Sequence, residues 1–316
     1  MLWTTDEIKA AWRGAYSFEE KEGGWLAAYQ YTKAQMAYFR QLRDFFYDRC
    51  FASSAKTLDF TTAAKHLKVE YRILWEGSQD SFELAINGQI TDIRYVKELA
   101  KEGVLEFALP GGDKRVTLYL PADATVELGA IETDGAMLPA KPGTPVLWLG
   151  DSITQGYGPL RSGMTYVSVA NRQLGWDVLN LGIGGYVYDA GSVQKMSGYQ
   201  PEKIVVALGT NQYRDEDMTP VRDFYRRLTE IWGNSIPILC VTPLWREGTP
   251  EEQARMKAFT KELREIVAAY PQVKVADGFS LVPHLNEYFL DGLHPNPLGC
   301  EVYGRNLAKA IREMGF

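Results

Sequence analysis

The stretch LWLGDSITQG, residues 147–156, decides the fold of this chain more than any other. An apolar run that begins at Val146 stops at Gly150-Asp151-Ser152, and a second glycine closes the stretch. This pattern predicts a buried strand that ends just before a serine, where a helix or loop begins. In open α/β sheets, ligands bind in the crevice outside the carboxyl ends of the strands. We therefore expect the hydroxyl of Ser152 to face a pocket.

From Thr144 onward, short apolar segments alternate with amphipathic helical patterns. The segments are rich in Val, Ile and Leu without strict alternation, which is typical of strands buried on both faces. Strand and helix patterns in this order predict βαβ units with right-handed crossovers, and hence a parallel sheet between two layers of helices. The five predicted strands are 145–149, 177–181, 203–208, 236–241 and 273–276.

Three helix starts are legible between or after these strands. Thr249-Pro250-Glu251-Glu252 combines a capping box with Pro at the first helical position. Thr219-Pro220 and Asn296-Pro297 predict two further starts, and Gly233 is expected to end the helix that begins near residue 219.

Residues 1–142 follow a different pattern. The first 54 are rich in aromatic side chains, and 32–47 has a helical pattern. Alternating segments follow, and the pairs Asn87-Gly88 and Gly111-Gly112 are typical of hairpin turns. We therefore predict an N-terminal β-sandwich of the jelly-roll kind, with a helical segment at its start, over 1–142. The Pro-rich stretch 138–145 would link it to a second domain over 143–316. The alternating segments are 67–75, 81–88, 104–109 and 115–120.

Polar and glycine residues follow several predicted strands. NLGIGGY (180–186) follows the second strand, GTNQ (209–212) the third, and DGLHPN (291–296) comes after the fifth. Each motif is weak alone, but their ordered combination with Gly-Asp-Ser is specific. On these motifs the chain resembles the SGNH, or GDSL, hydrolase superfamily, whose four blocks carry Ser, Gly, Asn and an Asp-x-x-His pair. The resemblance covers 143–316 and implies a flavodoxin-like three-layer α/β/α domain with a five-stranded parallel sheet.

Ester cleavage by a serine needs an activated hydroxyl, a base and donors aimed at the developing oxyanion. Ser152 is the candidate nucleophile, and the alternative is that it only caps a helix. Of the three histidines, His66 lies in a β-like segment and His284 has no acidic residue at a matching offset, whereas Asp291 precedes His294 by three residues. This offset lets the carboxylate accept from Nδ1 while Nε2 faces the serine. We predict that Ser152, Asp291 and His294 form a catalytic triad.

The resemblance also implies an oxyanion hole. Its donors would be the backbone N–H groups of Ser152 and of a second-block glycine, together with the side-chain amide of Asn211. Gly185 matches the family glycine best, and Gly184 remains an alternative. These glycines could instead serve only a tight turn with positive φ, and Asn211 could be a turn residue.

Two positions depart from the usual family pattern. Gln212 stands after Asn211 where many members carry Asp, and Tyr186 ends the second block where a polar residue is common. Neither change touches the triad, but both are expected to alter the pocket. Tyr186 and Trp245, which follows the fourth strand, are the predicted substrate contacts; for Trp245 the alternative is plain packing.

Composition limits the other function classes. There are 34 basic and 40 acidic side chains, a net charge of −6, and no basic stripe, so we expect no nucleic-acid partner. Three widely separated cysteines suit a reducing compartment. Neither a signal peptide nor a membrane span is visible, and no cluster suggests a metal. We therefore expect a cytoplasmic protein without metal or cofactor, and the oligomeric state stays open.

A β-sandwich that precedes an SGNH domain is similar to carbohydrate esterase family two, whose members remove O-acetyl groups from sugars. This likeness implies a serine carboxylic-ester hydrolase, a carbohydrate acetylesterase acting on a small-molecule or oligosaccharide ester. The sandwich would then wall one side of the active site. An acyltransferase, a thioesterase or a lysophospholipase with the same triad is the alternative. A non-catalytic carbohydrate-binding protein is a third and less favoured reading.

Overall fold

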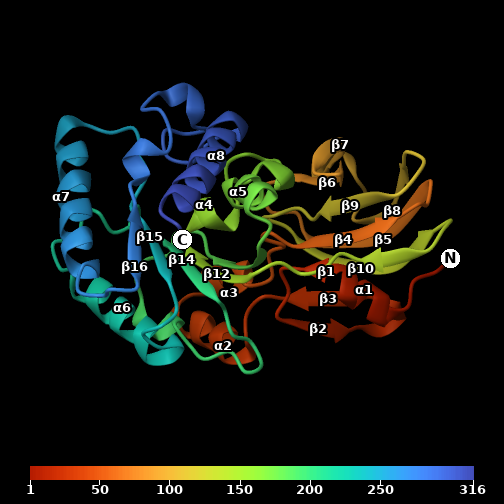
Figure 1. Cartoon of the computed structure of the whole chain (residues 1–316), viewed down its shortest axis with the longest axis horizontal. Helices are drawn as coiled ribbons and strands as arrows, with labels where there is room; N and C mark the ends of the chain where they lie inside the picture. Colours follow the sequence, from red (N-terminus) through yellow and green to blue (C-terminus); the bar gives the residue numbers. More distant parts are fainter.

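The computed structural model describes residues 1–316, which form three β-sheets with helices around the third (Figure 1). The first two sheets are antiparallel, with strand orders β1-β4-β9-β6-β7, where β11 also pairs with β4, and β2-β3-β10-β5-β8. Their strands are β1 (Trp12–Arg13), β2 (Ser17–Glu20), β3 (Leu26–Tyr29), β4 (Thr57–Thr62), β5 (His66–Trp75), β6 (Ser81–Ile86), β7 (Gln89–Tyr95), β8 (Glu102–Ala108), β9 (Lys114–Tyr119), β10 (Thr125–Thr133) and β11 (Met137–Pro139).

The two antiparallel sheets pack face to face. Phe60 and Leu84 from one sheet belong to the same buried cluster as Val69 and Leu128 from the other. The alternating segments of the sequence form these strands because every second side chain enters this shared core. The result is a β-sandwich.

One turn prediction is confirmed and another is wrong. Asn87 and Gly88 form the two-residue hairpin between β6 and β7, both with positive φ, as this turn type requires. Gly111-Gly112, in contrast, makes no hairpin. The strand before it, β8, pairs with β5 in one sheet, whereas β9 pairs with β4 and β6 in the other. The bend at the two glycines therefore carries the chain from one sheet to the other, across the core that the sheets share.

The third sheet is parallel throughout, with the order β13-β12-β14-β15-β16. This is the flavodoxin-like order of a doubly wound α/β domain, in agreement with the predicted fold class. The five predicted strands are all present, with small shifts at their ends. They are β12 (Pro145–Gly150), β13 (Asp177–Gly182), β14 (Lys203–Ala207), β15 (Ile238–Val241) and β16 (Val273–Ala276).

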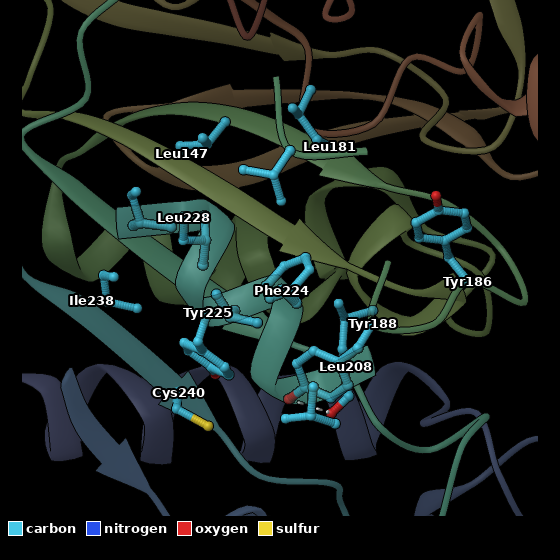
Figure 2. Packing of buried hydrophobic residues seen from close by; sticks show 14 of the residues in the cluster. Leu147, Leu181, Tyr186, Tyr188, Leu208, Phe224, Tyr225, Leu228, Ile238 and Cys240 are labelled. Carbon is cyan, nitrogen blue, oxygen red and sulfur yellow. Dashed lines mark hydrogen bonds between the residues drawn. The ribbon is translucent and has the colours of Figure 1, made fainter. Parts of the chain in front are cut away.

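Alternate residues of these strands enter two separate cores, which explains their nearly continuous apolar character. Leu147 and Val206 pack beneath α6 and α7, in the core shown in Figure 2, whereas Val146 and Val205 pack beneath α5 and α8. The sheet therefore lies between two helical layers. The helices of this part are α4 (Ser152–Gln155), α5 (Tyr166–Leu174), α6 (Thr219–Trp232), α7 (Pro250–Val267) and α8 (Pro297–Glu313).

The predicted helix starts are confirmed. Thr249 and Glu252 form a capping box at α7, and the Asn296 side chain caps α8. Gly233 ends α6 as predicted, but Thr219 is the first helical residue of α6, and Met218 occupies the cap position.

Part of the N-terminal segment packs against the parallel sheet, which the sequence did not predict. It forms α1 (Thr5–Ala11), α2 (Lys33–Leu42) and α3 (Asp44–Arg49). The connection from β13 to β14 contains only the short 3₁₀ turn Ala190–Ser192, and α2 packs against it. Phe39 joins the core under α6 and α7, and the Tyr38 hydroxyl donates to a carboxylate oxygen of Asp189 at 2.8 Å. A helix from the start of the chain thus completes one layer over the parallel sheet (Figure 1).

No helix combines the length and the apolar character needed to cross a membrane. All three cysteines are buried and unpaired.

Candidate active site

Ser152 lies where the sequence predicts it, directly after the carboxyl end of β12 and at the start of the short helix α4. The Asp151 side chain caps this helix by accepting the N–H of Ile153 at 3.0 Å. At position 150 only glycine fits, because a Cβ there would collide with the side chain of Thr154. Strand and helix can therefore meet at a sharp angle, which leaves the Ser152 side chain only half-buried.

The structure brings the three predicted triad residues together. Ser152 Oγ lies 2.9 Å from His294 Nε2, and His294 Nδ1 lies 2.8 Å from Asp291 Oδ2. The other carboxylate oxygen of Asp291 accepts the backbone N–H groups of Leu293 and His294, at 3.1 and 2.8 Å. With the ring proton on Nδ1 held by Asp291, Nε2 is free to accept the serine proton.

The charge of Asp291 suits this arrangement. Partial burial raises the pKa of Asp291, but hydrogen bonds from the backbone and ring of His294 outweigh burial and hold the pKa below its usual 3.8. The carboxylate is therefore ionised at neutral pH and can stabilise a positively charged imidazole ring.

The predicted oxyanion donors Gly185 and Asn211 follow β13 and β14, the two strands that flank β12 in the sheet, and the structure distinguishes the two candidate glycines. The N–H of Gly184 donates to Gln155 Oε1 at 2.6 Å and is therefore occupied. Gly185 is exposed with φ +73, and neither its N–H nor that of Ser152 meets an acceptor within the protein. Asn211 Nδ2 donates to the Tyr186 carbonyl at 2.9 Å, which leaves its second N–H available.

The two predicted substrate contacts, Tyr186 and Trp245, differ in their exposure to solvent. The Tyr186 side chain is only 5% exposed, and its hydroxyl donates to Asp189 Oδ2 at 2.5 Å. It belongs to the core shown in Figure 2, so the predicted substrate contact through this side chain is wrong. An apolar ring that follows a buried strand was drawn into the core rather than the pocket. The Trp245 ring is partly exposed and stacks on His284, with ring centroids 5.5 Å apart.

The family departure at Gln212 has a structural role. Its side chain is buried, and Gln212 Oε1 accepts the N–H of Tyr188 at 2.6 Å. This bond braces the loop after β13 from the side of Asn211. Sequence reasoning missed Gln155 and Asp123, whose side chains are hydrogen-bonded to each other, with Gln155 also bonded to the N–H of Gly184. A polar side chain within the quoted stretch was the only available signal for Gln155, and none existed for Asp123.

A cavity of about 400 Å³ lies elsewhere, at the amino ends of β12 and β13 between the sandwich and the parallel sheet. Two of its charged lining residues pair with each other, since Arg115 forms two hydrogen bonds with Asp59. No group of three or more His, Cys, Asp or Glu side chains is arranged to hold a metal ion.

Asp151 gives a prediction about stability. Burial raises the pKa of this carboxyl to about 7, so the native state keeps a proton that the unfolded state releases near pH 4. Folding stability should therefore fall as pH rises from about 4 to about 7. Asp151→Asn keeps an acceptor for the Ile153 N–H without the charge. We expect it to raise the free energy of unfolding at pH 8 by on the order of 1–4 kcal/mol. Urea unfolding across this range measures the change, and an unaltered pH slope in the variant would contradict it.

Known proteins resemble this chain both in its C-terminal part and over nearly its whole length. Residues 148–302 match the GDSL-like Lipase/Acylhydrolase family. The salicylyl-acyltransferase SsfX3, from a tetracycline biosynthetic pathway, is 21% identical, with a TM-score of 0.77 over 96% of this chain and 95% of that chain. A family two carbohydrate esterase from Cellvibrio japonicus is 17% identical, with a TM-score of 0.68 over 99% and 97%.

A family two carbohydrate esterase from Clostridium thermocellum, solved in complex with cellohexaose, is 16% identical, with a TM-score of 0.66 over 84% of this chain and 94% of that chain. At these identities the similarity establishes a shared fold. No protein with a curated description matches the sequence.

Proposed function

We propose, on the premise that residues 148–302 match the GDSL-like Lipase/Acylhydrolase family, that this protein is a serine carboxylic-ester hydrolase. One observation carries the proposal: an unbroken hydrogen-bonded path from Ser152 Oγ through the His294 ring to Asp291, with distances of 2.9 and 2.8 Å. Nucleophile, base and orienting carboxylate in hydrogen-bond contact are what acyl transfer through a serine requires. In this proposal residues 143–316 form the hydrolase domain and 1–142 the N-terminal domain.

The reaction would proceed through an acyl-enzyme. Ser152 Oγ attacks the ester carbonyl carbon while His294 Nε2 takes its proton, and Asp291 stabilises the charged ring. The carbonyl oxygen gains negative charge and receives hydrogen bonds from the N–H groups of Ser152 and Gly185 and from the Asn211 amide. His294 then protonates the departing alcohol. Water, deprotonated by His294, attacks the acyl-enzyme, releases the carboxylic acid and restores Ser152.

We further propose that the substrate is a small acyl ester, an acetyl group on a carbohydrate. The fold shared with the two family two carbohydrate esterases supports this class. The N-terminal domain supports it too, because the partly exposed ring of Phe45 lies next to Gly184 at the edge of the site. Aromatic side chains offer flat apolar faces and lose little conformational entropy when they bind a ligand. In this proposal Phe45 contacts the substrate beside Gly184. Trp245, whose side chain is partly exposed, remains a proposed contact.

A second candidate function is acyl transfer to an acceptor other than water. The fold shared with SsfX3 over nearly the whole of both chains favours it. The acyl-enzyme would form in the same way, and an alcohol or amine would then replace water in the second step.

A panel of esters separates these functions. We expect acetate release from acetylated mono- and oligosaccharides, and p-nitrophenyl acetate to be cleaved at least about tenfold faster than the octanoyl ester, because small pockets discriminate by a few kcal/mol. Each ester is assayed with and without an alcohol acceptor. A preference for octanoate would contradict the acetylesterase proposal. An acylated acceptor formed faster than free acetate would favour the transferase.

A further inference from the structure

Gln155, at the end of the helix that begins with Ser152, is held at both ends of its side-chain amide. The residue is 2% exposed. Its Oε1 accepts the N–H of Gly184 at 2.6 Å, and its Nε2 donates to Asp123 Oδ1, also at 2.6 Å. One buried amide therefore connects the loop after β13 with the sandwich.

Asp123 lies in the loop that leads into β10, and it is 4% exposed. Arg49 Nη1 lies 3.6 Å from Asp123 Oδ1 and balances its charge. The Arg49 guanidinium in turn lies over the rings of Trp75 and Phe45, at 4.1 and 4.8 Å from their centroids. The cation therefore contacts two aromatic rings as well as Asp123, so the acceptor that Gln155 uses pairs with a charge positioned by residues outside the hydrolase domain.

The bond to Gly184 bears directly on the oxyanion donor. Gly184 and Gly185 have no side chains to fix their peptide groups, and Gly185 adopts φ +73. On the far side, Gln212 and Asn211 brace the same loop. On the Ser152 side, the Gln155 carbonyl oxygen holds Gly184. Releasing it would free the Gly185 N–H, in the next peptide group, to turn away from the ester oxygen.

We propose that Gln155 is a positioning residue that aligns the Gly185 N–H with the developing oxyanion, and that Asp123 and Arg49 anchor it from the N-terminal domain. The inference rests on the proposed hydrolase function and deepens it. If Gln155 acts in this way, the N-terminal domain contributes to kcat, in addition to any role in binding substrate.

Variants that remove or exchange the Gln155 amide and the Asp123 carboxylate test whether their hydrogen bond positions the Gly185 N–H. Gln155→Leu removes both hydrogen bonds, and we expect kcat to fall about 10- to 100-fold with KM within about threefold of wild type, because the misplaced donor acts in the transition state. Gln155→Glu keeps the acceptor for Gly184 but sets a carboxylate against Asp123, and should lose a similar factor. The double variant Gln155→Glu/Asp123→Asn restores a donor–acceptor pair with roles exchanged. It should recover kcat at least about tenfold over Gln155→Glu.

Asp59→Asn is the matched control. Asp59 is also a buried aspartate of the sandwich that is paired with an arginine, but it lines the 400 Å³ cavity at the amino ends of β12 and β13. It should leave kcat within about twofold of wild type even if stability falls. A wild-type kcat for Gln155→Leu, or a double variant no better than Gln155→Glu, would overturn the proposal.

Amide hydrogen exchange at Gly184 gives a readout that needs no turnover. We expect exchange in Gln155→Leu to be at least about tenfold faster than in wild type, because the N–H loses its acceptor. Unchanged exchange overturns the positioning role. A wild-type protein that cleaves no ester refutes the proposed function instead, and the exchange result still decides whether Gln155 holds the loop.

Discussion

Replacing Ser152 with Ala lowers kcat for p-nitrophenyl acetate by about 10⁴- to 10⁶-fold, because the reaction then lacks its nucleophile. In the wild type, Ser152 Oγ donates to the only base in reach, His294 Nε2, at 2.9 Å. Removing the hydroxyl leaves the oxyanion donors in place, so a small residual rate above buffer is expected.

The Ser152 side chain is half-buried and fills no part of the apolar core. The free energy of unfolding of Ser152→Ala should therefore lie within about 0.5 kcal/mol of the wild-type value. Thermal melting of the same preparation checks that the protein in the assay is folded. A variant that keeps more than about one hundredth of wild-type kcat would require a different nucleophile.

Asp291→Asn gives the second large effect, a fall in kcat of about 10²- to 10⁴-fold. The oxygen that accepts the N–H groups of Leu293 and His294 is retained, and the new amide then presents N–H to His294 Nδ1. This favours the ring tautomer whose Nε2 carries a proton and cannot accept one from serine. The Asp291 side chain is 45% exposed, so water can relieve part of the mismatch, which places the expected loss in the lower half of the range.

The pH dependence of this effect follows from the depressed pKa of Asp291. A carboxyl with a lowered pKa keeps its charge above that value and loses it only as pH falls through it. The ratio of wild-type to Asp291→Asn kcat should therefore stay constant from about pH 7.5 to about pH 9, because the carboxylate is fully ionised throughout this range. At lower pH the same carboxylate also stabilises the charged imidazole ring of the wild type, which lowers the ratio. Asp277→Asn is the matched control, because Asp277 follows β16 as an exposed aspartate paired with Arg264. A ratio that falls more than about threefold between pH 9 and pH 7.5 would contradict the account.

The sequence predicted the parallel sheet and the meeting of Ser152, Asp291 and His294 for one physical reason. Parallel strands end at a common edge, so polar residues that follow several strands must gather there. The same argument could not choose between Gly184 and Gly185. That choice depends on where the Gln155 side chain points, which no pattern in the sequence records.

The failures have a common cause in long-range packing. Tyr186 was predicted to face the pocket, but Phe39, from the N-terminal segment, packs edge-on against its ring in the core. The turn at Gly111-Gly112 was predicted as a hairpin, but strand choice there is made by the sandwich core. Local patterns describe elements well, yet which distant element covers them depends on the whole chain.

Mass spectrometry of the protein after reaction with a fluorophosphonate tests the central claim most directly, because this reagent labels a serine only where a neighbouring base and an oxyanion hole activate it. The account predicts one adduct per chain, mapped to Ser152, absent from Ser152→Ala and formed more slowly by Asp291→Asn. An unlabelled wild-type protein, or an adduct that persists in Ser152→Ala, would contradict it.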